Sequence, residues 1–337
     1  MSPARRPHQA VRKPLSQGVR IEGPPAGRTL PVTIGANVDE TDLLGWARNN
    51  RAKVDDLLMR TGAVLFRGFA PLTLEAFGDF MTALSKAPME YRYRSTPRHS
   101  LHPGVYSSTE YPASQSIPLH NEMSYAREWP GCIAFCCILP PEDRGETPIC
   151  DSRAVYARIA EATRERFERQ GVLYVRNYGS GLDLRWQEVF QTDDRALVET
   201  YCRAHDIVFS WQGADGLRTR QRCQAVATHH ASGAKVWFNQ AHLFHLSALD
   251  PEVGKHLLAA HGELGLPRHA YLGDGSPIPD EDLAIIRQAY SDEAVVASWR
   301  RGDVLLLDNT LAAHGRAPFS GPRRIVVAMA DPRSSSS

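Results

Sequence analysis

The chain has 337 residues, enough for a large core, and it carries 39 basic against 38 acidic side chains. This balance gives no reason to expect nucleic acid or an anionic membrane as a partner, and we see no apolar run long enough for a membrane span or a signal peptide. The six cysteines form no C-x-x-C pair, which favours reduced, buried thiols and a cytoplasmic setting over a disulfide framework.

The first 28 residues are rich in Pro, Gly and Arg and have few apolar side chains. We therefore predict a mobile N-terminal arm over residues 1–28, followed by a single domain over 29–333. A mitochondrial transit peptide is the alternative for a start that is rich in arginine and poor in acids. The prolines argue against the amphipathic helix that such a peptide needs.

Three elements are predicted at the start of the domain. The segment 39–61 has the pattern of a helix, with Thr41 as a possible N-cap. The short apolar run "GAVLFRGF" at 62–69 is bounded by glycine, which suits a buried strand. The segment 73–84 has apolar side chains at helical spacing.

From Pro118 onward, short apolar segments separated by turn residues predict many strands. Helices interrupt them, and we expect helical insertions around 151–205 and 240–290. The helices do not alternate with the strands regularly enough for a doubly wound parallel sheet. We therefore predict a mainly β fold with flanking helices, built on a barrel or a sandwich.

The segment "IPLHNEMSY" at 117–125 places His120 and Glu122 one residue apart. In a strand, residues i and i+2 face the same way, so two metal-binding side chains project together. A surface pair without a role is the alternative, and a metal site needs a third ligand from a distant segment. Two histidines and one carboxylate form a facial triad that leaves positions on Fe(II) open for a cosubstrate and O₂.

His314 is the best third ligand because it follows the buried strand predicted in "GDVLLLDN" at 302–309. The chain then returns through "RRIVVAM", which would bring Arg323 and Arg324 back beside His314. Neighbouring residues in a strand face opposite ways, so only one of these arginines can point at the site. A guanidinium there can bind a carboxylate through two parallel hydrogen bonds.

These motifs together resemble the Fe(II)/2-oxoglutarate oxygenases of the taurine dioxygenase and clavaminate synthase type. The resemblance runs from about Gly62 to Asp331 through "GAVLFRGF", "LHNEMSY", "RGETPICDSR", "WRRGDVLLLDN", "HGRAPF" and "GPRRIVVAM". Glutamate in the H-x-E motif is closer to clavaminate synthase, since aspartate is usual in the family. The resemblance implies a double-stranded β-helix (jelly-roll, cupin-like) core, an Fe(II) centre, and 2-oxoglutarate and O₂ as cosubstrates.

The resemblance also implies roles for single residues. The metal ligands would be His120, Glu122 and His314. Thr147 and Arg324 would hold the distal carboxylate of 2-oxoglutarate, and Arg323 would then face solvent. An ordinary strand threonine is the alternative for Thr147. We expect Asn309 to fix the turn near the metal strand rather than to touch substrate.

One position departs from the family pattern. Taurine dioxygenase and clavaminate synthase carry an arginine four residues beyond the cosubstrate arginine, and it binds an acidic group of the substrate. Ala328 stands there in this sequence. An acidic group would have to be held elsewhere, with Arg94 and Arg127 as candidates, or be masked, for example as a carrier-protein thioester.

Other histidines have simpler explanations. His242 and His245 are three apart on a predicted helix, and packing or surface roles are favoured over the pocket. The adjacent His229 and His230 diverge, so they are not expected to be joint ligands. The segment 271–283 is either a lid or a turn into a helix that begins near Asp280.

We therefore predict oxidation, most simply hydroxylation, of an unactivated C–H bond in a small molecule. The resemblance to the branch linked to syringomycin-type biosynthesis implies an amino acid or amino-acid derivative in specialised metabolism, free or on a peptidyl carrier protein. Desaturation or cyclisation would use the same residues. Halogenation is disfavoured because Glu122 is present, and halogenating relatives lack the carboxylate ligand.

Two alternatives belong to other classes. One is a non-enzymatic metal-binding barrel, and the other is a zinc hydrolase, for which two histidines, a glutamate and a water would suffice. Neither has a use for a buried arginine that holds a cosubstrate.

Overall fold

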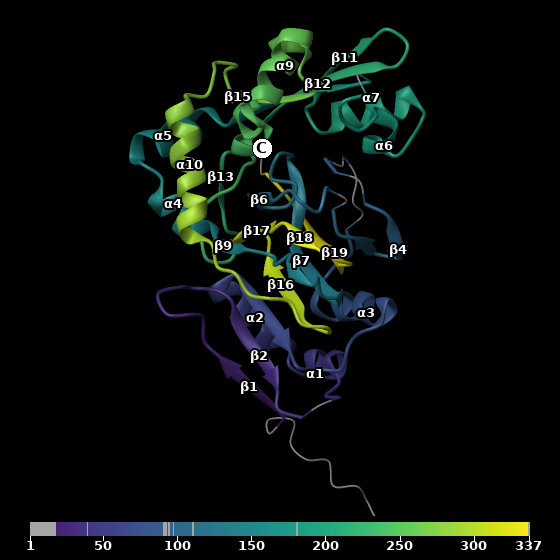
Figure 1. Ribbon diagram of the computed structural model, residues 1–337, viewed down its shortest axis with the longest axis vertical. Coiled ribbons are helices and arrows are strands. Elements are labelled where there is room, and N and C mark those ends of the chain that lie inside the picture. The colour runs from purple at the N-terminus through teal and green to yellow at the C-terminus, as the bar shows by residue number, and fades with distance from the viewer. Residues whose placement is uncertain are drawn as a thin grey trace, which may run out of the picture.

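The computed structural model describes residues 18–38, 40–89, 93, 95–96, 98–109, 111–179 and 181–335. Its largest sheet has eight strands in the order β1-β2-β3-β16-β7-β19-β5-β4 (Figure 1). In that order the strands are β1 (Val19–Glu22), β2 (Val32–Ala36), β3 (Ala63–Arg67), β16 (Val304–Asp308), β7 (Glu128–Leu139), β19 (Arg324–Ser334), β5 (Val105–Ser107) and β4 (Ser100–His102).

A three-stranded sheet lies against the large sheet. It consists of β6 (Ile117–His120), β17 (Ala312–Arg316) and β9 (Ile149–Asp151), in that order. Two small two-stranded sheets complete this region: β13 (Val226–Thr228) with β14 (Lys235–Trp237), and β18 (Phe319–Ser320) with β8 (Asp143–Arg144).

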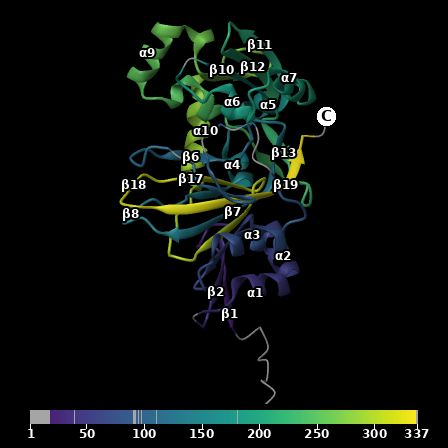
Figure 2. The same ribbon diagram turned by 90° about the vertical axis from the view of Figure 1, so that its right-hand side faces the viewer.

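A four-stranded sheet forms the end of the molecule farthest from α1 and α2 (Figure 1, Figure 2). Its order is β11 (Val208–Gln212), β12 (Gly216–Cys223), β10 (Val172–Tyr178) and β15 (Arg268–Leu272). The helices are α1 (Leu43–Asn49), α2 (Arg51–Thr61), α3 (Leu74–Leu84), α4 (Ser152–Arg158), α5 (Glu161–Gln170), α6 (Trp186–Phe190), α7 (Arg195–Ala204), α8 (Ala241–Phe244), α9 (Pro251–His261) and α10 (Asp280–Glu293), with short 3₁₀ turns η2 (Leu246–Ala248) and η3 (Glu263–Gly265).

The central strands of the large sheet are buried on both faces, which explains why β7 and β16 are continuous apolar runs. Alternate side chains enter two separate clusters. Phe135 and Val327 belong to the cluster between the two sheets. Ala134 and Ala328 belong to the cluster that packs on α1, α2 and α3. The predicted mainly β fold with a double-stranded β-helix core is confirmed by this pair of facing sheets and by the similar solved structures described below.

Part of the predicted N-terminal arm belongs to the fold. β1 pairs with β2 at the edge of the large sheet, and Arg28 forms an ion pair with Glu293 of α10 at 3.0 Å. The arm predicted over 1–28 is therefore too long, because residues 19–22 find a strand partner. Residues 1–17 lie outside the described part of the chain.

The predicted helices are found with two corrections. The segment 39–61 contains two helices that meet at Asn50. Asp42 occupies the N-cap position of the first helix without a side-chain capping hydrogen bond, while the hydroxyl of Thr41 donates to the carbonyl oxygen of Val38. α3 begins after Thr73, whose hydroxyl accepts from the backbone N–H of Ala76.

The helices α4 to α7 and α8 to α10 fall where the two helical insertions were expected. The division into a single domain with two insertions stays a prediction. The turn after β15 leads into α10 at Asp280, which fits the plain-turn interpretation of residues 271–283.

All six cysteines are buried free thiols, as predicted. Within the described ranges, no helix combines the length and apolar character needed to cross a bilayer.

Candidate metal centre and active site

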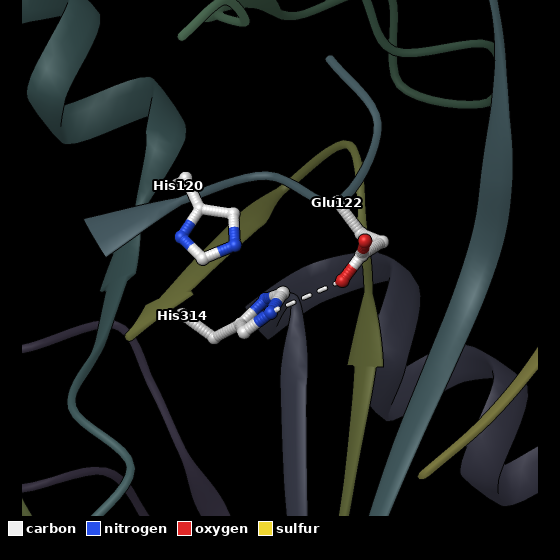
Figure 3. A group of neighbouring side chains, drawn as sticks. All are labelled: His120, Glu122 and His314. Carbon is white, nitrogen blue, oxygen red and sulfur yellow. Dashed lines mark ion pairs between the residues drawn. The ribbon is translucent and has the colours of Figure 1, made fainter. Parts of the chain in front are cut away.

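The pairing of β6 with β17 brings together residues almost 200 positions apart in the chain. His314 lies directly opposite His120, so both side chains leave the same face of the small sheet. Their ring centroids are 4.7 Å apart. Glu122 follows β6 by two residues, and its Oε2 lies 3.7 Å from Nε2 of His314. One potential ligand atom from each of the three residues lies within 4.8 Å of the others (Figure 3).

The donor atoms suit a divalent metal. Nδ1 of His120 lies 2.8 Å from the carbonyl oxygen of Pro118. A carbonyl can only accept, so Nδ1 carries the proton and Nε2 presents a lone pair. Burial, with a further contribution from His314, lowers the pKa of His120 to about 4, which keeps the ring neutral at physiological pH. Nδ1 of His314 is buried without a hydrogen-bond partner among the described residues.

Glu122 is buried but remains charged. Burial alone would raise its pKa, but Arg98, His314 and His120 outweigh this effect and hold the pKa far below its usual range. Nη2 of Arg98 donates to Oε2 of Glu122 at 2.6 Å, and each of these two side chains is 4 % exposed. Sequence analysis missed Arg98, because nothing distinguished it from the other arginines of "YRYRSTPR".

Asn309 fixes the backbone of Glu122. Its side chain accepts from the N–H of Glu122 at 2.7 Å and donates to the carbonyl oxygens of Glu122 at 2.9 Å and Pro130 at 2.8 Å. The expectation that Asn309 fixes the local chain path is therefore confirmed. These bonds tie the loop after β6 to the turn after β16.

The inward face of the small sheet continues from the histidines to a second cluster. Ile149 lies opposite His314, and the backbone bonds from Gly315 to Pro148 and from Ala317 to Glu146 continue the ladder. Strand alternation then places Thr147 and Arg316 on the same face as His314. The hydroxyl of Thr147 accepts from Nε1 of Trp299 at 3.1 Å, so its own proton is available to an acceptor.

The structure reverses the exposure expected for the two neighbouring arginines. Arg324 is exposed, whereas Arg323 is half-buried and donates from Nε to the carbonyl oxygen of Gly145 at 2.9 Å. Burial, and then the nearby Arg316, lower the pKa of Arg323 to about 10. The prediction that Arg323 faces solvent is wrong. The pairing of β19 with β7 has a register shift between Arg324 and Ile325, so the alternation of the later residues does not extend to the two arginines.

The structure also locates Ala328, the residue four positions after Arg324. Its side chain packs with α3 on the far face of the large sheet, away from the histidines. The residue four positions after Arg323 is Val327, which pairs with Phe135. The Phe135 ring lies 4.9 Å from the ring of His314. Neither Val327 nor Ala328 is an arginine, so the substrate arginine of the family pattern is missing from both positions.

Arg127, one of the two suggested replacements for that arginine, lies outside the site. Arg127 is 36 % exposed and pairs with Asp206 at 2.5 Å. Arg94 lies outside the described residues.

The comparisons with known proteins agree with this geometry. Residues 26–329 match the model of the family described as "Taurine catabolism dioxygenase TauD, TfdA family". The chain belongs to this family of Fe(II)- and 2-oxoglutarate-dependent dioxygenases. The oxygenase is thus an enzyme whose cofactor is Fe(II) and whose cosubstrate is 2-oxoglutarate, which sets aside the zinc hydrolase and the non-enzymatic barrel.

Two relatives are similar over most of their length. The oxygenase is 42 % identical over 279 residues to the dapdiamide synthesis protein DdaC of Enterobacter agglomerans, covering 83 % of this chain and 85 % of that protein. It is 33 % identical over 291 residues to a clavaminate synthase-like protein of Arabidopsis thaliana, covering 82 % and 83 %. Among solved structures, PvcB of Pseudomonas aeruginosa has the same fold, with a TM-score of 0.56, 14 % identity, and coverage of 96 % and 95 %.

The four other histidines considered from the sequence have structural partners. His242 is buried, places Nε2 3.0 Å from the carbonyl oxygen of Leu119, and packs on Tyr290. Nδ1 of His245 lies 2.8 Å from the Ser247 hydroxyl. His229 pairs with Asp308 and His230 with Arg333, so these neighbours diverge as predicted.

Proposed function

We propose that His120, Glu122 and His314 hold the iron, and that Arg323, Arg316 and Thr147 bind the distal carboxylate of 2-oxoglutarate. The assignment of the residues that bind the distal carboxylate rests on two cations that face inward. Among the described residues, Arg316 donates to the carbonyl oxygens of Tyr111, Pro112 and Gln115, and Arg323 donates to that of Gly145; neither forms an ion pair. Two neighbouring guanidinium groups removed from water favour an anionic guest.

Each residue then has a defined task. Bound Fe(II), together with 2-oxoglutarate and O₂, supplies oxidative decarboxylation coupled to oxidation of a C–H bond. The imidazole nitrogens of His120 and His314 and the carboxylate of Glu122 would hold the metal. Arg323 orients the cosubstrate through paired hydrogen bonds. The hydroxyl of Thr147 accepts from Trp299 and donates its own proton to the distal carboxylate of the cosubstrate. Phe135 and Val327 keep water away from the reacting side.

We propose that the substrate is an amino acid or an amino-acid-derived small molecule, free or bound to a peptidyl carrier protein, and that the reaction is hydroxylation. The 42 % identity to a protein named for dapdiamide synthesis supports a biosynthetic role. Val327 supports a substrate without a free carboxylate beside it, because burying an unpaired carboxylate costs several kcal/mol. A carrier thioester or an amide meets this condition.

A succinate-release screen tests the proposal. Each candidate amino acid is offered as the free acid, the amide and the carrier thioester, and the product mass distinguishes hydroxylation from desaturation or cyclisation. We expect the amide or the thioester to be turned over at least as well as the acid. Strong preference for the acid, with its carboxylate bound beside Val327, would contradict the proposal. In parallel, His314→Ala should abolish stoichiometric Fe(II) binding while the protein stays folded.

A further inference from the structure

Arg98 is a buried cation at the metal centre for which the proposed reaction has given no role. Its Nη2 donates to Oε2 of Glu122 at 2.6 Å, and the same oxygen lies 3.7 Å from Nε2 of His314. The guanidinium is held from other sides as well, since Nη2 lies 3.3 Å from the Thr109 hydroxyl and Nη1 lies 4.0 Å from Sδ of Met329. Oε2, the oxygen of Glu122 that lies beside His314, is thus also the oxygen that Arg98 binds.

We propose that Arg98 is a positioning residue that limits Glu122 to a one-oxygen metal ligand and lowers the metal affinity of the site. The proposal rests on the metal ligands named above and is independent of the identity of the substrate. A metal that binds Oε2 has to share it with a guanidinium, so the positive charge of Arg98 opposes binding of the cation. The guanidinium also holds the carboxylate in one orientation.

The purpose of this arrangement follows from the number of open positions on the metal. Three protein ligands leave three positions on a six-coordinate ion, and 2-oxoglutarate takes two of them when it chelates. A carboxylate that bound through both oxygens would take the last position, which O₂ needs. Arg98 therefore lowers the metal affinity of the site and in doing so keeps one coordination position open.

Removing Arg98 should change the metal affinity in the opposite direction to removing most residues that hydrogen-bond a metal ligand. Outer partners usually accept hydrogen bonds from ligands and raise their basicity, and removing them weakens metal binding about 10- to 100-fold. Arg98 donates to the ligand and is a cation. Its removal should therefore tighten metal binding, which a residue that merely stabilises the fold cannot do when it is lost.

The experiment measures Mn(II) and Co(II) affinity by anaerobic calorimetry in the wild-type protein and in Arg98→Gln and Arg98→Lys. We expect affinity to rise by about tenfold in Arg98→Gln. A smaller rise, about threefold, is expected in Arg98→Lys, because lysine keeps the positive charge but loses the planar guanidinium and its contacts to Thr109 and Met329. At equal amounts of bound iron, both variants should release less succinate than the wild-type protein. Circular dichroism and melting curves establish that each variant is folded.

Arg268→Gln is the matched control, since Arg268 pairs with the buried Asp183 at 2.5 Å and lies outside the metal group. Its metal affinity should equal that of the wild type. Unchanged or weaker metal binding in folded Arg98→Gln would overturn the proposal; should that variant not fold, the same result in Arg98→Lys would overturn it. A wild-type protein that binds neither metal would instead contradict the assignment of the three ligands.

Discussion

At the residue scale, the choice between Arg323 and Arg324 decides how 2-oxoglutarate binds. Arg323→Ala should raise the Michaelis constant for 2-oxoglutarate about thirtyfold or more, because stranding one partner of a buried charged pair costs ~2–5 kcal/mol. Arg324→Ala, the matched control, should have little effect, since Arg324 is exposed. Steady-state kinetics at saturating Fe(II) measures both. The opposite ranking would show that the last strand enters the site in the other register.

A second prediction at this scale concerns His242 and pH. Burial lowers the pKa of His242 to about 3 in the folded protein, against an ordinary value of 6.5. The unfolded state therefore binds more protons between these values, and stability falls as the pH drops from about 6.5 towards 3. His242→Gln removes this group and keeps a donor for the carbonyl of Leu119.

The free energy of unfolding, measured by urea titration of the metal-free protein from pH 7 to pH 4, checks this prediction. The slope of stability against pH should become shallower by up to ~1.4 kcal/mol per pH unit in His242→Gln. Equal slopes for the two proteins would show that His242 titrates normally.

At the scale of elements, the contact between β6 and β17 holds the metal site together. A Cβ placed on Gly315 would lie 2.6 Å from the carbonyl oxygen of Ile117 and 3.3 Å from the backbone nitrogen of Leu119. Both contacts are with backbone, so Gly315→Ala must push the two strands apart. The same pairing sets His314 opposite His120.

Gly315→Ala should lower stability by ~1–3 kcal/mol and weaken Mn(II) binding. Gly23→Ala is the control, since a Cβ there meets nothing within 4 Å. Calorimetric titration measures the Mn(II) affinity, and thermal melting measures the change in stability. Wild-type metal affinity in Gly315→Ala would mean that the strands can separate without moving the ligands.

At the scale of the whole molecule, metal and cosubstrate should stabilise the fold by mass action. A ligand present at 100 times its dissociation constant adds ~2.7 kcal/mol if it binds only the folded state. Anaerobic Fe(II) should therefore raise the melting temperature by several degrees, and EDTA should reverse the rise. 2-Oxoglutarate should raise it further in the wild type and in Arg324→Ala. The rise caused by 2-oxoglutarate should be lost in Arg323→Ala. A melting temperature that does not respond to Fe(II) would argue against a preformed metal site.

Local patterns in the sequence determined the chemistry of this protein. The spacing of His120 and Glu122, the late His314 and the order of the surrounding motifs were sufficient to indicate a facial triad and the family. The apolar run within residues 302–309 indicated a buried strand, which is β16. These features were readable because strand periodicity and metal-ligand chemistry both act over a few residues.

Only the tertiary structure decided which charged side chains enter the site. Arg323 is half-buried and Arg324 is exposed, beside a register shift between Arg324 and Ile325 that simple strand alternation does not anticipate. Farther along β19, Val327 faces the cluster between the sheets and Ala328 faces the helices. Arg98 and Arg316 had no distinguishing local signal. Their burial results from contacts with Glu122 and with the carbonyls of the segment 111–115, and such contacts between distant segments exist only once the sheets have closed.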